Sequence, residues 1–177
     1  MKTYIVLLRG VMPVGKNKVP MAQLRQMLSD AGFKDVRTYI ASGNVVLRSD
    51  LTPAKLAQRV HELIKKHIGP DLVVVVKTGS QLQKILDGNP LKKDDMSRVF
   101  YTMFAKKPSA QKVKEFTAQD YSPEEIVFNN DVAYVYIPGN YTKSKLDNNS
   151  IEKKLGVSST TRNLNTMRKL IELSKTK

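Results

Sequence analysis

The segment up to Lys77 alternates between short apolar runs and stripes of apolar residues spaced three and four apart. The runs are rich in β-branched residues and have the length of strands, whereas the stripes have the period of amphipathic helices. Helices are predicted after Pro20 and Pro53, because proline suits the first helical position and one face of each following segment is apolar. Strands are predicted at residues 3–9, 36–40, 45–47 and 72–77.

Ser42-Gly43-Asn44 lies between the second and third of these strands. Glycine and asparagine tolerate positive φ, so a tight turn is predicted here that makes the two strands an antiparallel hairpin. Each predicted helix links two strands, which gives the order β-α-β-β-α-β of a ferredoxin-like unit. Residues 1–79 are therefore predicted to form the first half of an α+β fold.

Residues 80–177 repeat this order in part. Asn163 precedes a last helix with an apolar stripe that includes Met167 and Leu170. We expect a second ferredoxin-like half, modified to β-α-β-β-α with an extra C-terminal helix and docked on the first. After a short helix at 81–86, the predicted strands are 98–105, 126–129 and 132–137, and the predicted helices are 110–119 and 145–155.

The charge balance is strongly basic, with 30 Lys and Arg against 16 Asp and Glu and a net charge of +14. Residues 1–79 carry 13 basic and 5 acidic groups, and residues 80–177 carry 17 and 11, so the excess is spread along the chain. The positive electrostatic field of such a chain favours polyanionic partners. The alternative is a generally basic protein with no polyanionic partner.

The composition also excludes several kinds of site. No cysteine is present, which excludes disulfides, thiol catalysis and cysteine-ligated metals. His61 and His67 lie six residues apart on one predicted helix, about 240° around it, and so cannot share a metal ion. The longest apolar run, Leu72 to Val76, is far shorter than the ~20 residues of a membrane helix. We expect a cytoplasmic protein without metal, cofactor or membrane segment, and leave its oligomeric state open.

The loop after the first strand contains the pattern Gly-x-x-x-x-Gly-Lys, from Gly10 to Lys16, followed by Asn17. A nucleotide-hydrolase phosphate loop needs a serine or threonine at that last place, to hold magnesium, and a helix that begins at the lysine. Here the helix starts later, because the residue before Pro20 resists helical conformation. The pattern therefore predicts a basic, glycine-hinged loop. Anion binding and a simple solvated connection both remain open for it.

Three polar blocks, each at the end of a predicted element, are candidates for one anion-binding site. Their side chains are mostly hydrogen-bond donors, and no carboxylate is among them. The alternative is local, because a hairpin turn and a helix cap use the same residue types. The candidate residues are Arg9, Lys16, Asn17 and Lys18 in the loop, Ser42 and Asn44 in the turn, and Arg162 and Asn163 before the last helix.

The segments RG-x-x-x-x-GKNKVPM, DVRTYIASGNVV and TTRNLNTMRKL carry these blocks. Together they resemble the bacterial family known as domain of unknown function 1697, and the resemblance extends from Tyr4 to about Leu173. The resemblance implies a two-part α+β fold on ferredoxin-like topology. It implies no activity.

Aromatic residues bear on one form of nucleic-acid binding. Ferredoxin-like RNA-binding domains stack bases on aromatic side chains of their two central strands. The first half offers only Tyr4, whereas the second places Tyr134 and Tyr136 on one strand face, with Tyr101 on another strand. Such a face binds single strands when it is open, but tyrosines also pack inside proteins, and the sequence leaves both outcomes open.

Two functions are compatible with these features. In the first, the protein binds nucleic acid or another polyanion through the basic loop and the Arg162 segment. In the second, the same residues bind a small phosphorylated ligand, as a binding protein or as an enzyme. The sequence does not decide whether a reaction is catalysed.

Overall fold

The computed structural model describes residues 1–176 and divides into two compact units. The first unit comprises Met1–Gln83 together with the residues from Lys169 onward, and the second comprises Lys84–Arg168. Each unit contains one four-stranded antiparallel sheet, and the described chain has six α-helices. The α+β class predicted from the sequence is confirmed.

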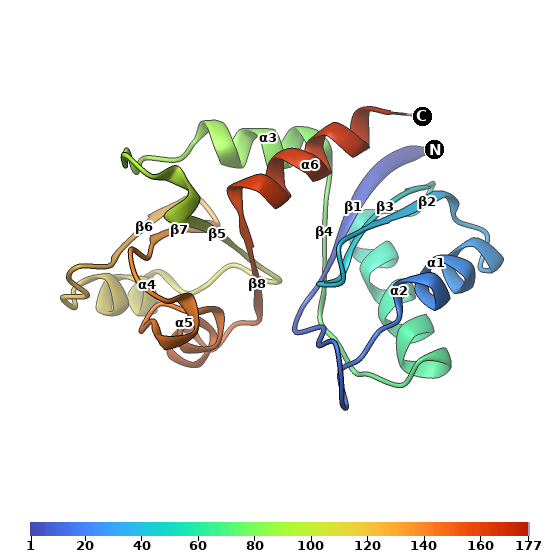
Figure 1. The fold of residues 1–177 in the computed structure, drawn as a ribbon, viewed down its shortest axis with the longest axis horizontal. Helices are drawn as coiled ribbons and strands as arrows, with labels where there is room; N and C mark the ends of the chain where they lie inside the picture. The colour runs from blue at the N-terminus through green and yellow to red at the C-terminus, as the bar shows by residue number, and fades with distance from the viewer. Residues whose placement is uncertain (177) are drawn as a thin grey trace. The chain divides into compact units, whose positions relative to one another are not determined.

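The first unit follows the predicted element order. Its strands pair in the spatial order β2-β3-β1-β4, and α1 and α2 lie together on one face of the sheet (Figure 1). The elements are β1 (Lys2–Leu8), α1 (Met21–Asp30), β2 (Lys34–Tyr39), β3 (Asn44–Ser49), α2 (Pro53–His67) and β4 (Val74–Lys77), and α3 (Gly79–Asp87) follows.

Both faces of the first sheet are buried. Tyr4, Val6 and Leu8 of β1 belong to the core under α1 and α2. Ile5 and Leu7 point to the opposite face, because side chains alternate along a strand, and both are 0% exposed. A strand buried on both faces is apolar at every position, which explains the unbroken run Ile5 to Leu8. Ferredoxin-like RNA-binding domains use an open sheet face, whereas Ile5 and Leu7 are buried on this face.

Arg37 of β2 ties the C-terminal helix α6 (Leu164–Lys175) to the first unit. Its Nη2 donates to the main-chain oxygens of Leu173 and Thr176, both at 2.8 Å, and its Nη1 donates to the hydroxyl of Thr176 at 2.5 Å. A cation at a helix C-terminus satisfies carbonyls that lack a helical partner and complements the helix dipole.

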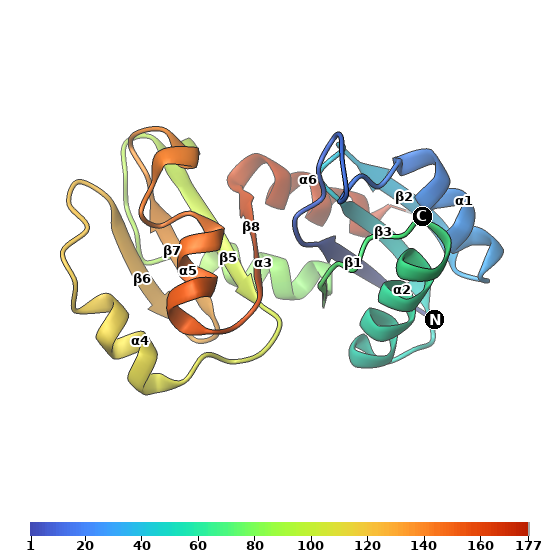
Figure 2. The same ribbon diagram turned by 90° about the horizontal axis from the view of Figure 1, so that it is seen from below.

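The second unit pairs its strands in the order β6-β7-β5-β8. The helices α4 and α5 lie on one face of this sheet (Figure 2). Phe116 of α4 and Ile151 and Leu155 of α5 form a core there with Phe104 and Val135 of the sheet. The elements are β5 (Val99–Phe104), α4 (Ala110–Thr117), β6 (Glu125–Asn129), β7 (Val132–Tyr136), α5 (Asn148–Leu155) and β8 (Ser159–Asn163), with short 3-10 helices η1 (Met96–Arg98) and η2 (Tyr141–Lys143).

The strand β8 corrects the sequence prediction, which gave this half only three strands. β8 pairs antiparallel with β5 at the sheet edge, with Thr161 opposite Thr102. Its sequence, Ser-Thr-Thr-Arg-Asn, has no apolar residue, so no hydrophobic alternation marks it. Hydrogen bonds take the place of apolar packing: the hydroxyls of Thr102 and Thr161 lie 2.8 Å apart. The second unit thus has the full β-α-β-β-α-β order before α6 begins.

Candidate functional site

The loop between β1 and α1 is a compact projection closed by its own main-chain hydrogen bonds (Figure 2). Met12 N–H donates to the oxygen of Asn17 at 3.0 Å, and Lys18 N–H donates to the oxygen of Gly15 at 3.1 Å. Gly10 and Gly15 have φ of 73° and 82°, a left-handed conformation that glycine adopts without strain. The loop has a defined shape of its own.

This shape differs from a nucleotide-binding phosphate loop. In that loop, the lysine lies where the helix begins, so that helical N–H groups converge on phosphate. Here α1 begins at Met21 with Pro20 as its N-cap, well after Lys16. The main-chain N–H of Lys18 also donates within the loop, to the oxygen of Gly15, and so does not point at a bound phosphate. The interpretation of Gly10 to Lys16 as a basic loop agrees with this geometry.

The second polar block lies directly against the base of this loop. Leu8 N–H donates to the oxygen of Gly43 at 2.8 Å. Gly43 has φ of 85°, and a Cβ at this position would lie only 2.7 Å from Leu8 Cβ and Val11 Cγ2. Only glycine therefore allows the turn this close to the chain entering the loop. Two of the three polar blocks are neighbours in space.

Within that turn, the two candidate residues differ in exposure. Asn44 is 0% exposed, and its Nδ2 donates to the Tyr39 oxygen at 3.1 Å and to the Ser42 hydroxyl at 3.0 Å. This amide closes the hairpin turn, as the local alternative predicted. Ser42 is exposed at the surface. Their role as ligand contacts stays a prediction.

The third polar block belongs to the second unit. Arg162 lies on β8, and its Nη1 donates to the Thr160 hydroxyl at 2.6 Å and to the Thr161 oxygen at 2.9 Å. Burial lowers the pKa of its guanidinium to about 10, and nearby Tyr141 partly offsets this. Asn163 accepts from Thr166 N–H at 2.9 Å and so caps α6, as predicted for this segment. That this block meets the other two stays a prediction.

A polar network that was not predicted from the sequence surrounds β8. Asn148 of α5 accepts from the hydroxyls of Ser159 and Thr161 at 2.9 and 2.8 Å, and its N–H donates to the Tyr141 hydroxyl at 3.0 Å. Burial raises the pKa of Tyr141. These residues come from η2, α5 and β8, so no short motif unites them. The polar run Ser159 to Arg162 was the one available hint.

The tyrosine face of the second sheet is closed. Tyr101 and Tyr134 are 1% and 2% exposed, and their rings meet edge to face at 5.8 Å. The Tyr134 hydroxyl donates to the oxygen of Ile85 at 2.8 Å, so the end of α3 covers this face. Lys93 lies over the Tyr136 ring at 4.6 Å. Base stacking on Tyr101 and Tyr134 is ruled out by their burial, and the alternative of interior packing holds.

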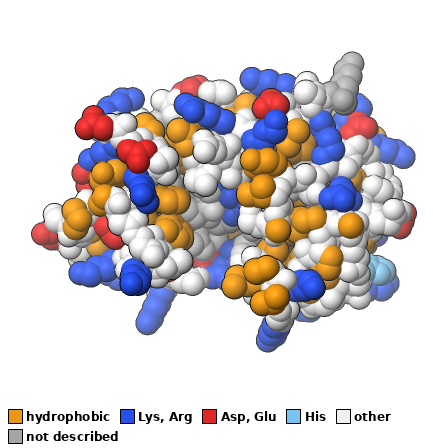
Figure 3. Space-filling view, viewed as in Figure 1, with side chains coloured by type: hydrophobic (Ala, Val, Ile, Leu, Met, Phe, Trp, Pro, Cys, Tyr) orange, Lys and Arg blue, Asp and Glu red, His pale blue; other side chains and the backbone are white. Residues whose placement is uncertain are grey.

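The cations of the loop have a different setting. Lys16 and Lys18 are exposed, and the ion pairs found within residues 1–176 leave both ammonium groups without a carboxylate partner. No acidic residue precedes Asp30 in the sequence. Elsewhere, blue side chains are spread over the visible face of both units (Figure 3). The loop is thus one basic element among many, set apart by a stretch of sequence without any acidic residue before Asp30.

Comparison with known proteins places the chain in a family. A family model described as a protein of unknown function (DUF1697) matches residues 1–134. The chain belongs to this family. The resemblance inferred from the three sequence blocks is confirmed, and the third block lies beyond the matched residues of this DUF1697 protein.

One solved structure of similar fold is that of the conserved bacterial protein SP0830 from Streptococcus pneumoniae. It is 23% identical, 98% of each chain is covered, and the TM-score is 0.76. At this identity the likeness describes the fold alone. No curated protein matches the chain.

The described part of the DUF1697 chain contains neither a metal-binding cluster nor a membrane-spanning helix. Within residues 1–176, no three His, Cys, Asp or Glu side chains gather in a way that could hold a metal ion. None of the helices in the same range combines the length and apolar character that crossing a bilayer requires.

Proposed function

We propose that this DUF1697 protein binds the phosphate backbone of a nucleic acid, or a similar polyanion, through the loop between β1 and α1. The observation that carries the proposal is the pair Lys16 and Lys18, both exposed and both without a carboxylate partner in the described residues. Ammonium groups that no internal carboxylate neutralises attract the phosphates of a nucleic acid and release the counterions condensed on it.

The loop geometry supports this use. The bonds Met12–Asn17 and Lys18–Gly15 hold the loop closed, so little conformational entropy is lost when a partner binds. The turn at Gly43 packs against its base and places the exposed Ser42 nearby. Serine hydroxyls are among the groups that contact phosphate oxygens.

The burial of Tyr101 and Tyr134 defines the mode of binding. Without an aromatic platform, contacts are made to phosphates and not to base faces. The proposed binding is therefore independent of sequence and strongly dependent on salt.

Fluorescence anisotropy with a labelled single-stranded oligonucleotide of about 20 nucleotides, longer than one such site, tests the proposal. The K16Q/K18Q variant should bind at least about tenfold more weakly at low salt. The matched control is K112Q/K114Q, which removes the same charge from exposed positions on α4. No binding by the native protein, or equal weakening in both variants, would refute the proposal.

The alternative of a small phosphorylated ligand at the same residues makes a separate prediction. Inorganic phosphate at millimolar concentration would then compete with the oligonucleotide and stabilise the protein against heat. At a polyanion site, by contrast, added phosphate and added chloride at the same ionic strength should weaken oligonucleotide binding equally.

We also propose that each unit is a ferredoxin-like domain. The order β-α-β-β-α-β and the strand orders β2-β3-β1-β4 and β6-β7-β5-β8 support this assignment. Nuclear Overhauser contacts from β1 to both β3 and β4 test it, and contacts from β1 to β2 instead would contradict it.

A further inference from the structure

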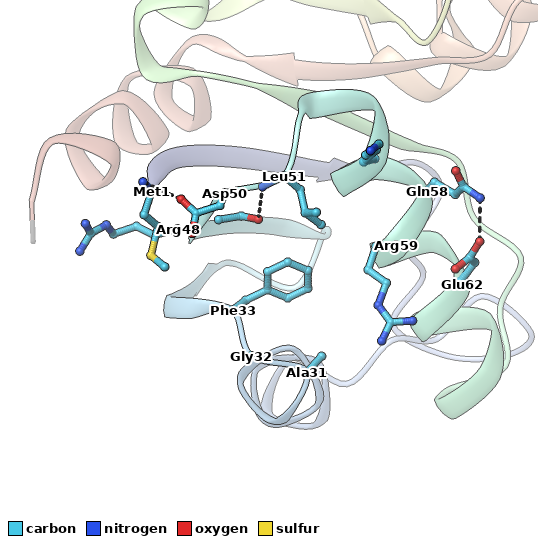
Figure 4. Close-up of a pocket in the computed structure, with 12 residues that line it drawn as sticks. Met1, Ala31, Gly32, Phe33, Arg48, Asp50, Leu51, Gln58, Arg59 and Glu62 are labelled. Atoms are coloured by element: carbon cyan, nitrogen blue, oxygen red, sulfur yellow. Dashed lines mark hydrogen bonds and ion pairs between the residues drawn. The ribbon is translucent and has the colours of Figure 1, made fainter.

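A cavity of about 480 Å³ lies in the first unit, away from the loop. It opens between the end of α1, the end of β3 and the first three turns of α2 (Figure 4). Its volume falls in the range of pockets that hold small molecules. All of its lining residues belong to one unit, so the cavity is a property of that unit alone.

One wall of the cavity is apolar. Phe33 is 8% exposed, and Leu51 lies beside it. Gly32, with φ of 94°, follows the end of α1 and turns the chain back. The main-chain N–H of Phe33 then donates to the oxygen of Leu28 at 3.2 Å. A Cβ on Gly32 would meet nothing within 4 Å, so the backbone here borders open space. The main-chain bond fixes the backbone of Phe33, and its largely buried side chain supplies an apolar border to the cavity.

The opposite wall is cationic. Lys55 and Arg59 lie four residues apart on α2, on the same face of the helix. Figure 4 shows the Arg59 side chain and the Phe33 ring at the border of the same opening. In residues 1–176, neither Lys55 nor Arg59 has a carboxylate within ion-pair distance.

The carboxylates that line the cavity have other partners. Asp50 pairs with the amino group of Met1 at 2.6 Å. Glu62 accepts from Gln58 Nε2 at 2.9 Å. Arg48 of β3, which also lines the cavity, pairs with Asp35 at 3.2 Å. Within residues 1–176, the charged groups of the lining without an ion-pair partner are therefore those of Lys55, Arg59 and Glu62, which leaves an excess of positive charge at the cavity.

We propose that the cavity binds a small organic anion, a phosphate or carboxylate joined to an apolar or aromatic group. The anionic group lies against Lys55 and Arg59, and the apolar group lies on Phe33. The guanidinium of Arg59 offers a planar pair of donors that suits either anion. The site is independent of polyanion binding by the loop, since it uses different residues.

Amide chemical-shift mapping with phenyl phosphate tests the site on the full chain. Shifts should cluster at residues 31–33, 49–52 and 55–59 and saturate with a Kd on the order of millimolar, as expected for so small a ligand. R59Q should weaken binding about tenfold, because a charge-assisted hydrogen bond is lost. The control K66Q removes a charge from an exposed position on the same helix, outside the cavity, and should change the Kd less than about twofold.

Phenol and inorganic phosphate, each titrated alone, test the two halves of the proposed ligand. Both should bind more weakly than phenyl phosphate. Equal affinity for inorganic phosphate would overturn the apolar part of the site, and equal affinity for phenol would overturn the anionic part. Shifts scattered away from the cavity, or equal effects of R59Q and K66Q, would overturn the site itself. Oligonucleotide binding by R59Q should match that of K66Q, which separates this proposal from the function of the loop.

Discussion

The main-chain N–H of Leu8 donates to the oxygen of Gly43 at 2.8 Å and joins the β2–β3 turn to the start of the basic loop. The two residues are far apart in sequence, and this bond extends the pairing of β1 with β3 by one step. It fixes where the loop leaves the sheet. The position of Lys16 and Lys18 thus depends on a contact between two segments that the sequence marks as separate motifs.

Substitution of Gly43 by alanine should destabilise the protein by about 2–4 kcal/mol. The new Cβ would lie 2.7 Å from two side-chain atoms and would sit on a residue with φ of 85°. Gly15→Ala is the matched control, because φ is 82° there but nothing lies within 4 Å of the new Cβ. It should cost only about 1 kcal/mol from the backbone strain.

Urea denaturation of both variants measures the difference. Equal losses of unfolding free energy would show that close packing at Gly43 does not hold the turn against the loop.

Arg37→Gln should cost about 1–3 kcal/mol and loosen the end of α6. The change removes the bonds from the guanidinium to the main-chain oxygens of Leu173 and Thr176. Hydrogen exchange of the last-turn amides of α6 should accelerate. In the control Arg25→Gln, the lost bond goes to the exposed hydroxyl of Thr38, so stability should change by less than about 0.5 kcal/mol. Unchanged exchange in Arg37→Gln would contradict the capping role.

The stability of the protein at high pH should depend on Tyr134. Burial, with a contribution from Tyr101, raises the pKa of Tyr134 to about 12. Between pH 10 and 12 the unfolded chain loses this proton while the folded protein keeps it. Unfolding is therefore favoured progressively as the pH rises, by about 1.4 kcal/mol per pH unit for this one group. Below pH 10 the contribution is fully present.

Tyr134→Phe isolates this effect from the titration of the many lysines. At pH 8 the variant should be about 1 kcal/mol less stable, because the oxygen of Ile85 loses its hydrogen bond. The deficit should shrink and then reverse toward pH 12, as measured by urea denaturation at each pH. A constant difference across this range would contradict the raised pKa.

The sequence predicted most of the fold because its signals are local. Apolar runs and stripes, Thr52 and Ser109 as helix caps, and Gly156 in the left-handed conformation after α5 are each visible within a few residues. The strand β8 was not predicted because its burial depends on side-chain hydrogen bonds to β5 and α5, which apolar periodicity does not reveal.

The candidate site was less predictable for the same reason. That the loop and the turn meet follows from the register of β1 with β3, which no single motif encodes. Burial of Tyr134 beside Tyr101 depends on where the end of α3 lies, and a strand pattern alone cannot show whether a face is covered. The cavity at Arg59 is lined by residues of three separate elements, and no regular spacing in the sequence connects them.

The salt dependence of oligonucleotide binding tests the loop proposal most directly. The logarithm of the association constant should fall linearly with the logarithm of salt concentration, with a slope near −0.7 for each phosphate contacted. If Lys16 and Lys18 each contact one phosphate, the slope of K16Q/K18Q should be shallower by about 1.4, and that of K112Q/K114Q should be unchanged. Equal slopes in the native protein and K16Q/K18Q would contradict phosphate binding by this loop.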